Sequence, residues 1–374
     1  MFRISASRLA LSMAALLLCA ACAQRPENVF LASEPIAVPT AKVDMLVATT
    51  RQPSSVPGEM FGGGRGTPGF AEIVISIPPG HKTGAVEWPE KIPADPAVSF
   101  ATVSAEMISR DEAKARFAKR LARGPSRSVL VFVHGYNNRF DDAVFRFAQI
   151  VHDSGTDAIP VLFTWPSRGK LLAYGYDRDS ATYSRDALER LLHYLVADKS
   201  VGEISVLAHS MGNWVTLETL RQMAIRDGGI PPKIRNIMLA DADVDIDIFR
   251  TQVAEMGSKR PDFTIFVSRD DKALAASKIL WGSTARVGEI DPNAADYKDF
   301  LAQNRISVVN MTDIKTDDAV NHGKFAESPK IIQLIGKQLA TGQPVTDHAQ
   351  KANPLSSVGL VTAGAVTAIT SGGQ

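Results

Sequence analysis

Cysteine is almost absent from this 374-residue chain, which has only Cys19 and Cys22. Both lie within the first 22 residues, so the rest of the chain can form no disulfide within itself and depends on its hydrophobic core. A charge imbalance is also missing, because 41 lysines and arginines face 40 aspartates and glutamates. With no basic patch that contains interleaved aromatic side chains, nucleic acid is not an expected partner.

The N-terminal residues have the composition of an export signal. Two arginines precede an apolar run from about Leu9 to Ala21, which is too short for a stable transmembrane helix. The sequence "CAAC" resembles a bacterial lipobox in which Cys22 carries the lipid, and the lack of a disulfide partner favours this interpretation. The alternative is ordinary cleavage after Ala23. We expect residues 1–22 to be a signal peptide, and the exported protein to be lipid-anchored in the cell envelope, facing the periplasm.

Beyond the signal, the chain divides into a tether, one large domain and a tail. Residues 23–41 are rich in proline and alanine and are expected to be the tether, and residues 341–374 are expected to be poorly ordered. The domain spans 42–340. A content of 45% hydrophobic and 22% charged residues is typical of a globular protein with a sizeable core.

The pattern within the domain predicts a layered α/β fold. Strand-like segments at 42–50, 70–78 and 98–108 are followed by apolar strands at 128–135, 159–166, 203–210, 234–243, 262–268 and 305–313, which alternate with helices at 109–123, 139–152, 177–197, 211–225 and 328–340. Apolar strands separated by helices indicate a parallel sheet covered on both faces. The glycine-rich segment 61–69 lacks the features of a phosphate loop and is expected to be a mobile turn.

The segment "EISVLAHSMGNWVTLETL" places Ser210 between an apolar strand and an amphipathic helix. A serine hydroxyl is a weak nucleophile unless a base removes its proton, and a sharp strand-to-helix turn exposes the hydroxyl to that base. The strand and the helix crowd the positions two before and two after the serine, which hold Ala208, where glycine is usual, and Gly212. This context favours a nucleophile over a serine that merely caps the helix.

The loop after the strand "VFVHG" is the second element of the expected site. Enzymes with such a turn stabilise the developing oxyanion with one backbone N–H from this loop and one from the residue after the nucleophile. These residues would be Tyr136 and Met211. We expect Gly135 to turn the chain sharply and His134 to orient the loop rather than to act as the base.

The base is expected after the last strand, because such enzymes carry the nucleophile, the acid and the base in this order along the chain. Five of the seven histidines precede Ser210, and His348 lies in the tail. His322 follows the last predicted strand and precedes the last predicted helix. Its position and the elimination of the others agree, so His322 is the predicted base.

The acid that orients the histidine is expected at the end of a strand. Asp270 and Asp271 follow one apolar strand, whereas Asp241 and Asp243 end the strand before it. We prefer Asp271 and expect Asp270 to cap the next helix, and the other two aspartates stay as alternatives. The acidic run 241–247 lacks the glycine and the glutamate of a calcium loop, so no metal site is predicted there.

Five segments carry a resemblance to a known family: "FVHGYNNRFDDAVFRFAQI", "LFTWPSRGKLLAYGYDRDSA", "LAHSMGNWVTLETLR", "SRDDKAL" and "NHGKF". In this order they resemble a bacterial family of α/β-hydrolase-fold proteins, described as esterase/lipase-like and formerly labelled a domain of unknown function. The similarity covers about 42–335. It implies a mostly parallel central sheet flanked by helices, with antiparallel N-terminal strands, and a triad of Ser210, Asp271 and His322.

The motifs and the resemblance together predict a serine hydrolase. It would cleave a small-molecule carboxylic ester through an acyl-enzyme, with no metal and no organic cofactor. Two alternatives stay open: an acyltransferase or amidase with the same triad, and a catalytically silent hydrolase fold that serves as an envelope binding protein. The expected partners are the ester substrate and, through the lipid on Cys22, the membrane.

Overall fold

The architecture comes from a computed structural model, which describes residues 25–33, 39–280, 284–342, 359–362 and 365–366. The strands are β1 (Ala41–Pro53), β2 (Phe61–Ile77), β3 (Ala101–Ile108), β4 (Ser128–Val133), β5 (Ile159–Thr164), β6 (Glu203–His209), β7 (Ile234–Ala240), β8 (Asp262–Val267), β9 (Ser307–Asn310), β10 (Gly359–Thr362) and β11 (Ala365–Val366). The helices are α2 (Arg110–Arg123), α3 (Phe140–Ser154), α4 (Tyr174–Ala197), α5 (Gly212–Asp227), α6 (Ile246–Met256), α7 (Lys272–Leu280), α8 (Ala295–Gln303), α9 (Lys324–Glu327) and α10 (Pro329–Thr341). Short 3-10 turns lie at Leu171–Ala173 and Val287–Glu289.

The described strands form one sheet, in the order β11-β10-β9-β8-β7-β6-β4-β5-β1-β2-β3. From β9 to β1, all neighbouring strands are parallel. The N-terminal strands β1, β2 and β3 pair antiparallel with one another. The predicted fold class, a mostly parallel sheet with antiparallel N-terminal strands, is therefore confirmed.

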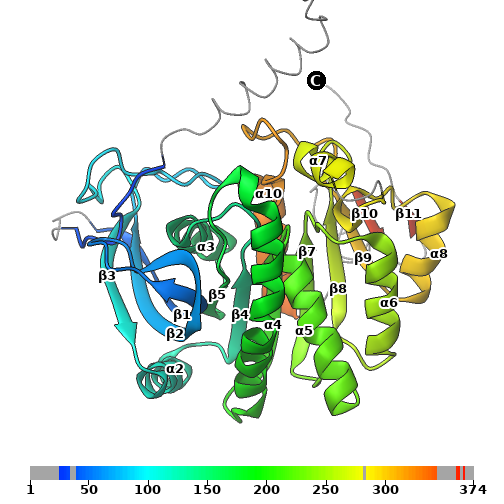
Figure 1. Ribbon diagram of the computed structural model, residues 1–374, viewed down its shortest axis with the longest axis horizontal. Coiled ribbons are helices and arrows are strands. Elements are labelled where there is room, and N and C mark those ends of the chain that lie inside the picture. Colours follow the sequence, from blue (N-terminus) through cyan, green and yellow to red (C-terminus); the bar gives the residue numbers. More distant parts are fainter. Residues whose placement is uncertain (1–24, 34–38, 281–283, 343–358, 363–364, 367–374) are drawn as a thin grey trace, which may run out of the picture.

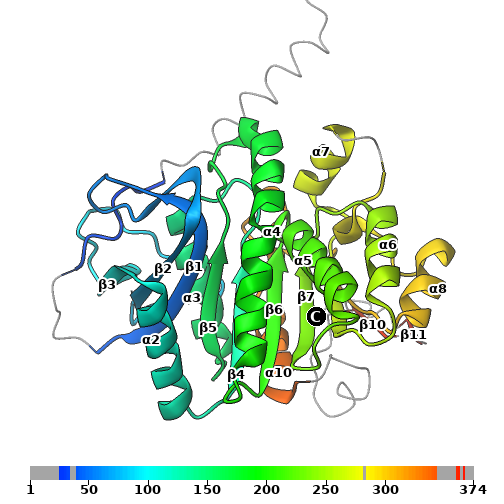
Figure 2. The same ribbon diagram turned by 60° about the horizontal axis from the view of Figure 1, so that its bottom comes forward.

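Helices cover both faces of this sheet. In Figures 1 and 2, α2, α4, α5, α6 and α8 lie on one face, and α3 and α10 lie on the other. Strand β4 shows why both faces are apolar: Val129 and Val131 join the core under the first layer, whereas Leu130 and Phe132 join the core under the second. Successive side chains of a strand point to opposite faces, so a strand buried on both sides must be apolar throughout.

The glycine-rich segment 61–69 is part of β2, and the prediction of a mobile turn there is wrong. The segment pairs with β1 through Thr49 and Gly69, then through Arg51 and Arg65, with register shifts between these pairs. The shifts bring the two backbones close together, since a Cβ at Gly66 would lie 2.9 Å from the Arg51 carbonyl oxygen. Glycine in a strand allows such an approach, so it marks an irregular strand here rather than a turn.

Two segments outside the predicted domain contact it. In the expected tether 23–41, Val29 is buried and its carbonyl accepts a hydrogen bond from Thr102 Oγ1 at 2.7 Å. Phe30 packs against Phe140, so these apolar side chains dock the segment on the domain. Most of the tail 341–374, which is expected to be poorly ordered, lies outside the described residues; within it, β10 pairs antiparallel with β9 at the edge of the sheet.

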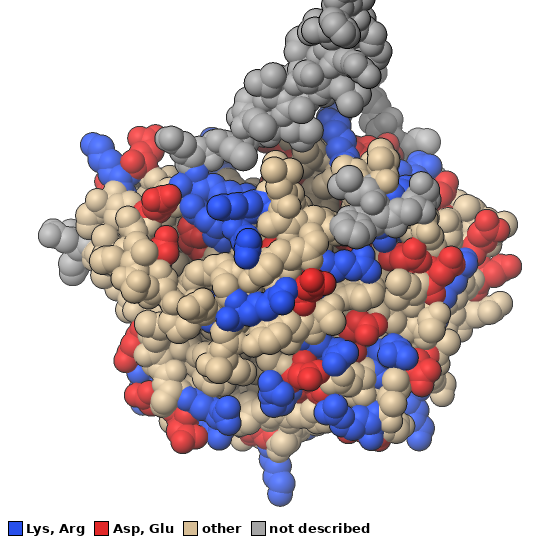
Figure 3. Space-filling model, in the orientation of Figure 1, with Lys and Arg blue, Asp and Glu red and all other residues tan. Residues whose placement is uncertain are grey.

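The remaining surface features concern charge and membranes. On the face in Figure 3, lysines and arginines are interspersed with aspartates and glutamates over much of the surface, in line with the net charge of +1. No helix in the described part of the chain is long and apolar enough to cross a membrane. The expected signal peptide 1–22, with Cys22, lies outside the described residues.

Candidate active site

Ser210 occupies the turn between β6 and α5, with φ at +51°. A non-glycine residue in this left-handed region is strained by about 1–3 kcal/mol and needs support from its surroundings. The Ser210 N–H donates to Ala240 O at 2.9 Å, and Ser210 O accepts from the backbone N–H of Asn213 at 3.1 Å and of Asp243 at 3.3 Å. The Asn213 side chain adds another hydrogen bond to Ser210 O at 2.9 Å. The strained turn that the sequence predicts at this serine is present.

Crowding around this turn explains the small residues beside it. A Cβ at Gly212 would lie 2.4 Å from His134 O, so no other residue fits without a shift of the backbone. A Cβ at Gly135 would lie 2.8 Å from Ser210 Cβ, which shows how closely the loop after β4 approaches the serine. Ala208 is fully buried, and its methyl group is accommodated where glycine is usual.

His322 and Asp271 meet at the carboxyl edge of the sheet, from the loops that follow β9 and β8. The distance from His322 Nδ1 to Asp271 Oδ2 is 2.6 Å. The other carboxylate oxygen, Asp271 Oδ1, accepts from the backbone N–H groups of Ala273 at 2.9 Å and Leu274 at 3.0 Å. Asp271 therefore caps α7 and contacts the histidine at the same time. The prediction that Asp270 caps this helix is wrong.

Asp270 is held elsewhere by a buried lysine. Lys324 Nζ lies 2.7 Å from Asp270 Oδ1 and 2.8 Å from Oδ2, and its side chain is fully buried. The ammonium also donates to the carbonyls of Met311 and Thr312. Lys324 was not predicted as a site residue, although its place two positions after His322 hints at a role in fixing that loop.

The surroundings of His322 favour its charged form. Burial lowers its pKa, but the negative charge of Asp271 and the hydrogen bond to it outweigh burial and raise the pKa to about 9. Asp318 Oδ2 accepts from the backbone N–H of His322 and of Gly323. The imidazole is thus held by Asp271 and its backbone by Asp318.

His322 also lies against the turn that carries Ser210. His209 Nε2 is 3.0 Å from His322 O, and the two rings are 4.9 Å apart. Within the described residues, Ser210 Oγ makes no hydrogen bond, so the structure pairs His322 with Asp271 but not directly with Ser210. Such nucleophile–base contacts are often long without substrate.

The two backbone N–H groups expected to bind an oxyanion have no acceptor in the described part of the chain. Met211 precedes the first residue of α5, and Tyr136 follows Gly135 in the loop after β4. His134 stacks on Trp165 at 4.8 Å, and its Nε2 lies 3.1 Å from the backbone N of Trp165. Burial lowers the pKa of His134 to about 3, with the charge of Arg51 adding to the effect. His134 Nδ1 lies 2.9 Å from Gly135 O, so the ring is fixed against the loop after β4.

The alternative acids do not contact His322. Asp243 accepts hydrogen bonds from Tyr174 and Ser277, both at 2.7 Å. Asp241 is fully buried with φ at +45°, and neither of its carboxylate oxygens has a partner among the described residues. Burial, and then the charge of Asp271, raise the pKa of Asp241 well above its ordinary value, which favours the neutral form of this carboxyl.

Comparison with known proteins points to one family. The model of a family described as "Alpha/beta hydrolase of unknown function (DUF900)" matches residues 109–338. The uncharacterized protein alr1448 of Nostoc sp. strain PCC 7120 is 27% identical over 310 residues, which cover 63% of this chain and 79% of that protein.

Two solved structures are also similar to this chain. A protein provisionally described as a cell surface hydrolase, from Lactobacillus plantarum WCFS1, has 11% identity and a TM-score of 0.34, covering 61% of this chain and 97% of its own. A lipase-esterase related protein from Clostridium acetobutylicum ATCC 824 has 13% identity and a TM-score of 0.27, covering 58% and 95%.

Proposed function

The chain belongs to the alpha/beta-hydrolase family of unknown function whose model spans 109–338, and on that premise we propose that it is a serine hydrolase acting on carboxylic esters. The observation that carries the proposal is the 2.6 Å contact between His322 and Asp271, beside the strained turn at Ser210. These three side chains follow β6, β8 and β9 in the parallel part of the sheet, in the chain order serine, aspartate, histidine.

In the proposed reaction, Ser210 Oγ attacks the ester carbonyl carbon while His322 Nε2 takes its proton. The backbone N–H groups of Met211 and Tyr136 stabilise the resulting oxyanion. His322 then gives the proton to the departing alkoxide, which leaves as the alcohol, and an acyl-enzyme remains on Ser210. Water, deprotonated by His322, attacks this acyl group and releases the acid and the free serine. Asp271 keeps the imidazole in the tautomer that this sequence requires.

Replacement of the nucleophile tests the proposal. Ser210→Ala should lower the hydrolysis of p-nitrophenyl esters by about 10⁵- to 10⁶-fold, as for other serine hydrolases, and should abolish labelling by a fluorophosphonate probe. Ser200→Ala, which changes an exposed serine after α4, is the matched control and should behave like the wild type. Full turnover by Ser210→Ala would refute the mechanism. A wild-type protein that the probe fails to label would instead be a silent binding protein.

The acceptor and the cellular location are further parts of the proposal. Products formed with competing alcohols and amines would distinguish hydrolysis from acyl transfer, and amide substrates would reveal an amidase.

We also propose that the protein is exported and anchored in the cell envelope by a lipid on Cys22. The lipobox-like sequence "CAAC" and the lack of a partner cysteine support this anchor.

A further inference from the structure

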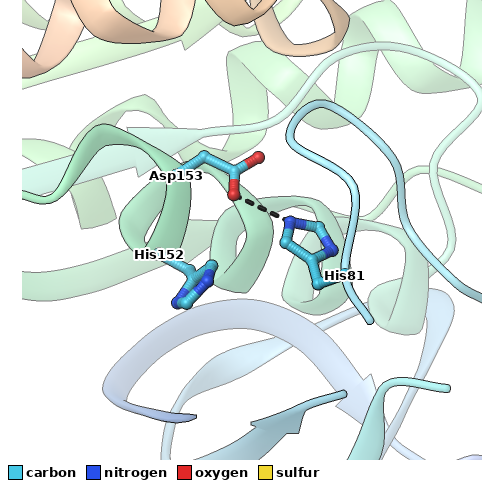
Figure 4. Close-up of side chains that lie close together, drawn as sticks. All are labelled: His81, His152 and Asp153. Carbon is cyan, nitrogen blue, oxygen red and sulfur yellow. Dashed lines mark hydrogen bonds and ion pairs between the residues drawn. The ribbon is translucent and has the colours of Figure 1, made fainter. Parts of the chain in front are cut away.

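A second group of reactive side chains lies outside the candidate active site. His81 belongs to the loop between β2 and β3, and His152 and Asp153 belong to the last turn of α3. Figure 4 shows His81 reaching from its loop to Asp153, with His152 beside them. Each residue offers a potential metal-ligand atom, and these atoms lie within 4.8 Å of one another. The reaction proposed above uses none of the three residues.

The hydrogen bonds around this group orient two of the potential ligand atoms toward each other. His81 Nε2 is 2.8 Å from Asp153 Oδ1, while His81 Nδ1 is 2.7 Å from Glu87 Oε2. Asp153 Oδ2 accepts from the Gly84 N–H and from Gln149 Nε2, both at 2.7 Å. A carboxylate on the far nitrogen of a histidine, and donors on the far oxygen of a carboxylate, are the outer contacts typical of protein metal ligands.

The side chains are buried enough to be held in place. The side chain of His81 is 6% exposed and that of Asp153 is 1% exposed. His152 is only partly buried and its imidazole makes no hydrogen bond among the described residues, although its ring lies 5.3 Å from that of His81. The His152 side chain can therefore rotate without breaking a hydrogen bond.

The donor set favours one class of metal. Two imidazole nitrogens and one carboxylate oxygen suit Zn²⁺, whereas Mg²⁺ and Ca²⁺ prefer oxygen ligands alone. Around a tetrahedral Zn²⁺, ligand atoms lie about 3.3 Å apart, given metal–ligand distances of about 2.0–2.2 Å. The contact from His81 to Asp153 would widen slightly, and the other separations in the group would close by at most about 1.5 Å. Rotation of the His152 side chain can supply that change.

We propose that His81, His152 and Asp153 bind one Zn²⁺ ion, with water in the fourth position. The ion would join the loop between β2 and β3 to the end of α3. Gln149 extends this connection, because its Nε2 donates both to Asp153 and, at 3.0 Å, to Ala326 O in α9. The site would therefore stabilise the domain without taking part in the chemistry at Ser210.

Zinc titration of the full chain, prepared without a histidine tag and stripped with a chelator, tests this proposal. Calorimetry should show one Zn²⁺ per chain, and the melting temperature should rise by about 5 °C at a zinc concentration a hundredfold above Kd. Mg²⁺ should give no such rise. His152→Ala should weaken binding at least tenfold, and Glu87→Gln should weaken it by about tenfold through the loss of its contact with His81.

The control variants separate this site from other histidines. His193→Ala removes a histidine that lies beside two carboxylates, those of Glu189 and Asp227, which do not form a potential metal-binding group in the described part of the chain. This variant and Ser210→Ala should bind zinc as the wild type does. A wild-type chain that binds no stoichiometric zinc would overturn the proposal. Equal zinc affinity in the wild type, His152→Ala and Glu87→Gln would overturn it as well.

Discussion

The change Asp271→Asn separates the two contacts of one carboxylate. In the wild type, Oδ1 caps α7 through the N–H groups of Ala273 and Leu274, and Oδ2 contacts His322 Nδ1. Asparagine keeps one oxygen, and asparagine and aspartate are nearly equal as N-caps. The amide NH₂ then replaces the oxygen that faces the histidine. The helix cap should survive this change, and the contact with the imidazole should not.

The expected loss follows from the tautomer of His322. An NH₂ group facing Nδ1 can only donate, so Nδ1 must become the acceptor and the proton must move to Nε2. An imidazole with its proton on Nε2 cannot take the proton of Ser210. In well-studied triads this change lowers turnover by about 10⁴-fold, which corresponds to about 5.4 kcal/mol in the activation barrier. The free energy of unfolding should fall only by what the charged contact with His322 contributes, because the cap remains.

Two measurements check this separation: kcat on a p-nitrophenyl ester, and urea unfolding followed by circular dichroism. Asp271→Ala is the matched variant, since it also removes the cap and should lose about 1 kcal/mol more stability at similar activity. Asp243→Asn should keep most of its activity, because Asp243 contacts Tyr174 and Ser277 rather than His322. Activity near the wild-type level in Asp271→Asn, or its loss in Asp243→Asn, would refute the assignment of the acid.

Three other outcomes are expected. The kcat/KM of the wild type should rise with pH toward about 9, because only the neutral form of His322 accepts a proton. The midpoint of this rise should lie at lower pH in Asp271→Asn, which lacks the charge that raises the pKa of His322. A wild-type profile that is flat through neutral pH would contradict this. Asp270→Asn should destabilise the fold by about 1–3 kcal/mol in urea unfolding, because it weakens the pair between the buried Lys324 and a partly exposed carboxylate. Its kcat should change little, and a loss of kcat as large as in Asp271→Asn would contradict a purely structural role for Asp270. The wild type should take up radiolabelled palmitate and fractionate with membranes, and Cys22→Ser should not; an unlabelled wild type that begins at Gln24 would show ordinary cleavage.

Most of the fold could be predicted because its signals are local. Apolar strands alternate with helices, and Ser109 caps α2 by accepting a hydrogen bond from the Glu112 N–H, as its sequence suggests. Helix α6 is not predicted, because it begins inside the acidic run 241–247, whose aspartates suggest a calcium loop or the catalytic acid. Asp245 in that run is the N-cap of α6 and accepts hydrogen bonds from two backbone N–H groups. Asp245 is a typical N-cap residue, but the aspartates on either side of it make it hard to distinguish as a cap from the sequence alone.

The candidate site shows which features could be predicted from neighbouring residues and which could not. Ser210 could be found from its neighbours alone, because the strain at its turn requires small residues at fixed positions. The roles of Asp270 and Asp271 could not be divided in the same way, since they depend on side chains more than 50 residues further along the chain. The sequence pattern assigns one aspartate to the helix and the other to the histidine. In the structure, the buried ammonium of Lys324 pairs with Asp270. Asp271 caps α7 with one carboxylate oxygen and contacts His322 with the other. A buried cation needs a partner more than a helix end does, since an unpaired buried charge costs several kcal/mol and a missing cap costs about 1 kcal/mol. That difference, which appears only when the chain is folded, decides which aspartate orients His322.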